Sequence, residues 1–160
     1  MSARPLTPAE KALSRSVFGD AIDLAAVLVR HRRWWPFQPR NAVMAPDGDI
    51  WCHPRGGLYR DCYAAASLQM QALFVHEMVH VWQAQTRGRW YLPLMRHPFC
   101  TYAYRLAPGR PFARYGIEQQ AEIVADAFLL MRGVTRIGGP RLADYRAILP
   151  FSPFAAAESE

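Results

Sequence analysis

The sequence predicts an α+β fold, with a small β-sheet in the N-terminal half and two long helices in the second half. Two segments, 67–85 and 117–133, place apolar residues at helical spacing, and short apolar runs flank the turn signal Pro46-Asp47-Gly48. With 160 residues, 51% of them hydrophobic, the chain can bury the core of one ordinary domain. We expect a single domain over residues 1–154 and a disordered tail at 155–160.

The N-terminal half is expected to contain one helix and the sheet. Thr7-Pro8-Ala9-Glu10 is typical of a capping box with proline at the first helical position. The helix should therefore run from Pro8 to Phe18 and end at Gly19. Short apolar segments follow at 25–29, 42–45 and 49–52, which predict a sheet of two or three strands.

The second half is predicted to be mainly helical. The first long helix begins at Asp61 or Ser67, continues through Gln85 and ends at Gly88, and the second runs from about Ile117 to Gly133. A short C-terminal helix is expected over 141–149. Residues 89–116, between the long helices, are rich in arginine, proline and tyrosine and show no periodicity. Loops of this length are usually functional or mobile.

Charge and composition restrict the partners. The net charge of +6 is carried almost entirely by arginine, since Lys11 is the only lysine. The basic run 30–33 precedes Trp34 and Trp35, a combination that single-stranded nucleic-acid grooves use. The other arginines are dispersed, which favours a solvated strand end and disfavours nucleic acid as a partner.

The expected location follows from the apolar segments. No run approaches the roughly 20 apolar residues of a membrane span, and the N-terminus lacks the apolar stretch of a signal peptide. We expect a soluble, cytoplasmic protein without a membrane span. Export by a specialised secretion system would need no N-terminal signal and is left open.

The residues that carry chemistry are concentrated in His76-Glu77-Met78-Val79-His80, inside the first long helix. The two imidazoles, four residues apart, project from the same side of the helix and can chelate one ion. A catalytic zinc site needs three protein ligands and an open position for water, while a nearby carboxylate takes the proton of the water. The motif therefore predicts Zn²⁺ bound by His76 and His80, with Glu77 as the base for peptide hydrolysis.

The third ligand is expected on the second long helix. The extended motif His-Glu-x-x-His-x-x-Gly-x-x-His is excluded, because Gln83 and Thr86 occupy its glycine and third histidine positions. His97 is the weaker candidate, because a lone loop histidine is more often a surface residue. Glu118 and Glu122 are each followed by an acid four residues later, so that either can bind the metal while the next acid orients a ligand histidine. The residues themselves leave Glu118 and Glu122 open.

Four segments of the chain, at residues 6–10, 17–23, 76–85 and 118–128, resemble small bacterial zinc metallopeptidases related to Vgr or found beside Rhs and secretion-system proteins. The resemblance implies a zincin-like fold of gluzincin type, a peptide or protein substrate, and secretion-system or effector proteins as partners. In that family Glu-Gln-Gln-Ala recurs after the zinc helix, which favours Glu118 as the third ligand and leaves Glu122 as the alternative.

Three functions remain after the sequence is considered, and nucleic-acid binding through the basic run is the least favoured of them. The first is a zinc-dependent metallopeptidase with Glu77 as general base. The alternative is a non-catalytic, zinc-stabilised interaction module associated with a bacterial secretion system or effector. Hydrolysis also needs a donor for the charge that develops on the carbonyl oxygen. The loop offers seven donors among which the sequence does not choose: Tyr91, His97, Tyr102, Tyr104, Arg105, Arg114 and Tyr115.

Overall fold

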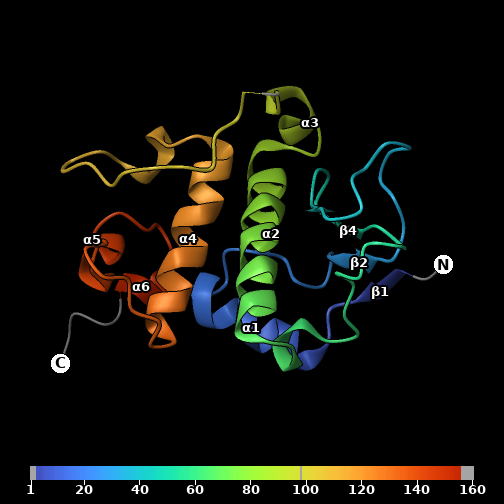
Figure 1. Ribbon diagram of the computed structural model, residues 1–160, viewed down its shortest axis with the longest axis horizontal. Helices are drawn as coiled ribbons and strands as arrows, with labels where there is room; N and C mark the ends of the chain where they lie inside the picture. The colour runs from blue at the N-terminus through green and yellow to red at the C-terminus, as the bar shows by residue number, and fades with distance from the viewer. Residues whose placement is uncertain (1–2, 98, 156–160) are drawn as a thin grey trace.

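The computed structural model describes residues 3–97 and 99–155 and has the predicted α+β architecture. Helices α2 (Leu68–Arg87) and α4 (Ile117–Met131) lie side by side at the centre of the molecule (Figure 1). The sheet lies on the α2 side of the pair and two short helices lie on the α4 side, where α5 (Leu142–Arg146) contacts α4 and α6 (Ser152–Ala155) contacts the N-terminal helix. The two long helices therefore form the frame on which the other elements are placed.

Helix α1 (Pro8–Phe18) has the predicted bounds, because both halves of the capping box form. The Thr7 hydroxyl accepts a hydrogen bond from the Glu10 backbone at 3.1 Å, and the Glu10 carboxylate accepts one from the Thr7 backbone at 2.8 Å. Gly19 ends the helix with φ +58°, where a Cβ would stand 2.5 Å from the Ser152 hydroxyl. Glycine at this position thus allows α6 to pack against the end of α1.

The sheet is mixed and has four short strands: β1 (Ala3–Pro5), β2 (Leu28–Arg30), β3 (Val43–Met44) and β4 (Ile50–Cys52). Their order is β1-β2-β4-β3, with β2 and β4 parallel and the outer pairs antiparallel. The expectation of two or three strands was too low, because β1 has only three residues and shows no period. Strand β2 also begins later than the predicted segment 25–29.

The long helices agree closely with the periodicity of the sequence. The Ser67 hydroxyl caps α2, which settles the choice between Asp61 and Ser67, and Gly88 ends the helix with φ +95°. Helix α4 ends at Met131, two residues before the predicted glycine. The core between the helices includes side chains with no exposed surface: Val75, Met78, Val79, Ala121, Ile123, Val124 and Ala127.

Residues 89–116 contain a helix that the sequence does not predict. Helix α3 (Tyr91–Met95) has five residues, too few to show a helical period, and a 3₁₀ turn follows at Phe112–Arg114. Leu92 of α3 is buried against Ala84 of α2 and Ile117 of α4. The segment is therefore anchored to both long helices.

At the C-terminus, α5 falls inside the predicted segment 141–149, whereas α6 is not predicted. Phe151 meets the rings of Phe18 and Trp82 edge-on, which fixes this end of the chain against α1 and α2. Ala155 is the last residue of α6, and residues 156–160 of the predicted tail lie outside the described residues. Within the described part of the chain, no helix has both the length and the apolar character to cross a membrane.

Candidate metal centre

Three predicted ligands, His76, His80 and Glu118, come together between α2 and α4. The Nε2 atoms of the two histidines are 3.3 Å apart, and Glu118 Oε2 lies 3.0 Å from His80 Nε2 and 3.4 Å from His76 Nε2. All three side chains are buried, and the ligand atoms lie within 4.8 Å of one another. This group could bind a metal ion.

Gln83 connects the histidine pair to α4. Its Oε1 atom lies 2.8 Å from His80 Nδ1, while its Nε2 donates to the Ile117 carbonyl at 3.1 Å and to Gln120 Oε1 at 3.0 Å. Because the glutamine oxygen accepts, His80 carries its hydrogen on Nδ1, and Nε2 keeps a lone pair for a metal. The sequence pattern gives Gln83 no such role, although it stands three residues after His80 on the same face of the helix.

Glu122 lies behind His76 and outside the ligand group. Its Oε1 is 2.9 Å from His76 Nδ1, and its side chain is 36% exposed. A carboxylate in this position holds the hydrogen on Nδ1 and directs Nε2 toward the centre. The structure thus brings Glu118 to the two Nε2 atoms and gives Glu122 the place of an orienting carboxylate.

The acids at the centre have different electrostatic surroundings. Burial favours a higher pKa for Glu118, but the two histidines and Arg96 hold the pKa of that carboxyl well below its usual range. Burial favours a lower pKa for His76, but Glu118 and Glu122 raise it to about 10. Glu118 is therefore an anion, which suits a metal ligand.

Glu77 differs from the other acids of the site because it is buried without a partner. Only 4% of the residue is exposed, and its Oε2 has no hydrogen-bond donor in the described part of the chain. Burial raises the pKa of the Glu77 carboxyl above its usual value, although His76 and His80 oppose the shift. A carboxylate in such surroundings can accept a proton readily.

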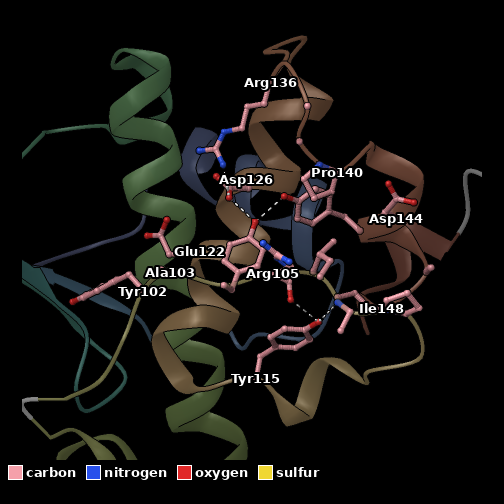
Figure 2. Close-up of a pocket in the computed structure, with 18 of the residues that line it drawn as sticks. Tyr102, Ala103, Arg105, Tyr115, Glu122, Asp126, Arg136, Pro140, Asp144 and Ile148 are labelled. Carbon is pink, nitrogen blue, oxygen red and sulfur yellow. Dashed lines mark hydrogen bonds and ion pairs between the residues drawn. The ribbon is translucent and has the colours of Figure 1, made fainter.

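A cleft of about 400 Å³ opens onto His76 and Glu77. It adjoins a cavity of about 930 Å³, formed by residues 102–109, α4 and α5 (Figure 2). Residues that line both spaces are Tyr102, Glu122, Asp126 and Arg136. In the larger cavity Asp126 accepts hydrogen bonds from Tyr104 at 2.5 Å and from Arg136 at 2.8 Å. The candidate centre is thus accessible from a space large enough for several side chains of a polymer.

Other residues singled out in the sequence lie away from the centre. His97 is not in the ligand group, and its Nδ1 accepts a hydrogen bond from the Phe99 backbone at 3.2 Å. In the basic run, the Arg30 guanidinium is paired with Asp49 at 2.7 Å and stacks on the Trp51 ring at 4.9 Å. Arg30 therefore contributes to the packing of the sheet.

Comparison with known proteins places the chain among bacterial effector domains. No family model matches the chain. Over 134 residues, 80% of the chain, it is 40% identical to the type VI secretion system spike protein VgrG2b of Pseudomonas aeruginosa, and it spans 13% of the length of that protein. The effector domain of Pseudomonas aeruginosa VgrG2b has a solved structure that matches with a TM-score of 0.71 and 35% identity, covering 91% of this chain and 81% of that domain. The chain therefore belongs to the family of the VgrG2b effector domain.

Proposed function

We propose that the chain is a zinc-dependent metallopeptidase of zincin-like, gluzincin type that acts as an effector module of a bacterial secretion system. The observation that carries the proposal is the buried, unpaired Glu77 carboxylate beside the group His76, His80 and Glu118. Kinship with the VgrG2b effector domain supports the association with secretion. The substrate we propose is a peptide or protein.

Zinc fits the donor set better than the other common ions. Two imidazole nitrogens and one carboxylate oxygen are the ligands of one class of catalytic zinc sites, whereas Ca²⁺ and Mg²⁺ take mainly oxygen ligands. His76, His80 and Glu118 would hold the ion, with Gln83 and Glu122 orienting the two imidazoles. When bound there, zinc supplies a polarised water and a Lewis acid for the substrate carbonyl.

The remaining steps of hydrolysis would be carried out by protein residues. Glu77 accepts the proton of the attacking water and then delivers it to the leaving nitrogen of the peptide. Its burial supports this role, because burial raises the pKa of the Glu77 carboxyl and so makes the carboxylate a stronger base. The cavity beside the cleft would hold the flanking residues of the substrate.

A second candidate is a zinc-stabilised interaction module that cleaves nothing. The observation that favours it is the set of hydrogen bonds through Gln83, which joins α2 to α4 across the centre. A metal at this position would stabilise the packing of the helices even without catalysis. Kinship with an effector domain is compatible with either function.

The test compares the wild type with Glu77→Gln. Both proteins are purified without chelator, zinc is measured by elemental analysis, and cleavage of fluorescein-labelled casein and of a random peptide library is followed. The proposal expects about one zinc per chain in both proteins, and a loss of hydrolysis of about 10²- to 10⁴-fold in the variant. Zinc without cleavage by the wild type would favour the interaction module. Absence of zinc even after reconstitution would reject both functions.

A further inference from the structure

Tyr102 lies at the entrance of the candidate metal centre. Its ring stacks on the ring of His76, with centroids 6.1 Å apart and planes inclined by 24°. Tyr102 is 50% exposed and borders both the cleft and the larger cavity. In Figure 2 its ring is directed away from the other residues of the larger cavity. The hydroxyl is therefore available to a molecule that enters over His76.

The other tyrosines of the loop are already engaged. The Tyr104 hydroxyl bonds Asp126 and Tyr145, and the Tyr115 hydroxyl accepts from the Ala107 backbone at 3.1 Å. Tyr91 packs on the small apolar cluster around Leu92. Only Tyr102 among them borders the cleft that contains Glu77.

The charged candidates of the loop are also placed elsewhere. Arg105 borders the larger cavity, His97 lies in a separate recess, and Arg114 is exposed on the 3₁₀ turn. None of these three side chains lines the cleft at His76. Of the seven donors that the sequence left open, the geometry retains Tyr102.

Arg96, which was not among the seven candidates, connects Tyr102 to the third ligand. Its Nη2 lies 2.9 Å from Glu118 Oε1, an ion pair without good hydrogen-bond alignment, and its guanidinium lies beside the Tyr102 side chain, with which it shares the lining of the cleft. Glu118 thus faces the histidines with one oxygen and Arg96 with the other. The Arg96 backbone donates to the Leu92 carbonyl at 2.9 Å, so the anchored helix α3 fixes where Arg96 stands.

We propose that the Tyr102 hydroxyl donates a hydrogen bond to the oxygen that gains negative charge on a substrate bound at the metal centre, and that Arg96 is a positioning residue that holds Tyr102 and Glu118 in place. The proposal rests on the proposed function of the same site. A preorganised donor of this kind contributes about 10²- to 10³-fold to kcat in hydrolases where one has been removed.

The test uses acetohydroxamate, a small anion that chelates metals, because it reports on the donor without a known substrate. The protein is loaded with Co²⁺, and the hydroxamate is titrated while the visible absorption of the cobalt is recorded. In Tyr102→Phe, which keeps the ring on His76, we expect hydroxamate binding to weaken about 10- to 100-fold, as for loss of a hydrogen bond to a charged group. Cobalt affinity should stay within about twofold of the wild type.

Three further variants test the assignment. Tyr104→Phe makes the same chemical change at a hydroxyl that is engaged with Asp126, and should bind hydroxamate like the wild type. Arg96→Ala should weaken hydroxamate binding, and Arg96→Lys should restore part of it. Equal hydroxamate binding in wild type and Tyr102→Phe overturns the inference while the metal site stands. Loss of cobalt in Tyr102→Phe overturns it too, because the residue would then support the site itself. A wild type that binds no cobalt overturns the proposed function together with the inference.

Discussion

The α2–α4 pair and the segment 89–116 contribute to the candidate site in different ways. The helices supply the three potential ligands and Glu77, all on regular backbone that packs through fully buried side chains such as Val79 and Ala121. The segment supplies Arg96 and Tyr102, which stand on irregular backbone and touch the ligands from outside. The two regions meet on Glu118, whose Oε2 faces the histidines and whose Oε1 faces Arg96. Rigid elements thus place the ligands, and the segment complements their charge.

The largest effect should follow from removing the ligand that the two regions share. Glu118→Ala removes the only anion among the three ligands. The zinc affinity of this variant should therefore fall by more than the 10- to 100-fold that is typical when a residue supporting a ligand is lost. Glu122→Ala removes only the partner of His76 Nδ1 and should stay within that 10- to 100-fold range. Competition with a chromophoric chelator measures both constants.

Glu118→Gln is the matched control for shape, because it keeps the volume and removes the charge. Its zinc affinity should lie close to that of Glu118→Ala. If Glu122→Ala loses more zinc affinity than Glu118→Ala, the two glutamates exchange roles and the ligand group described above is wrong.

The second-largest loss of zinc affinity is expected from Gln83, whose hydrogen bonds connect α2 to α4. Gln83→Ala removes the acceptor of His80 Nδ1 and two donors to α4, so zinc affinity should fall about 10- to 100-fold. Gln85→Ala changes the same residue type two positions along α2, where the side chain exchanges hydrogen bonds with the Asp23 backbone and does not reach α4 in the described part of the chain. Zinc binding of that control should equal the wild type, and equal losses in the two variants would assign the effect to α2 as a whole.

The same contrast explains how far the sequence could be interpreted. Helices α1, α2 and α4 were predicted because capping residues and an apolar period are local signals, and the pair His76 and His80 follows from helical spacing alone. The choice of Glu118 over Glu122 depends on how α4 packs against α2, and the residues themselves left it open. Helix α3 and strand β1 are too short to show a period. The ion pair between Arg96 and Glu118 could not be predicted from the sequence, because it depends on how the irregular segment returns to α4 and no local pattern indicates this.

A third prediction loosens the segment while the helices stay intact. Leu92 is 4% exposed and holds α3 against Ala84 and Ile117, so Leu92→Ala should destabilise the segment by about 2 kcal/mol, the lower end for such a truncation. Hydrogen exchange measured by mass spectrometry should accelerate over residues 91–96 and change little in α2 and α4. Zinc affinity should fall by less than about tenfold, because every ligand stays on a helix.

Leu94→Ala provides the control, since this neighbouring side chain is 81% exposed. Its exchange rates and zinc affinity should match the wild type. If Leu92→Ala loses zinc as completely as Glu118→Ala, residues 89–116 would be needed to hold the metal ligands in place. The conclusion that the long helices alone place the ligands would then be wrong.

The smallest effect on the site is expected from a change at Glu10 of α1. This side chain is fully buried and accepts hydrogen bonds from both Arg4 Nη atoms at 2.8 Å. Burial favours a higher pKa for Glu10, but Arg4 and the Tyr63 and Thr7 backbone amides hold the pKa below its usual 4.5. A lowered folded-state pKa means that the carboxylate stabilises the fold above pH 4.5 and loses this contribution as the pH falls through the folded value.

The free energy of unfolding of metal-free protein, measured with denaturant from pH 7 to 3, should therefore fall more steeply in the wild type than in Glu10→Gln. The variant should be less stable than the wild type at pH 7, because its amide places a donor against the Arg4 guanidinium. Zinc affinity at pH 7 should be the same in the wild type and in Glu10→Gln, since Glu10 touches neither region of the site. A difference in zinc affinity would show that the part of the molecule around the sheet helps to set the ligand geometry.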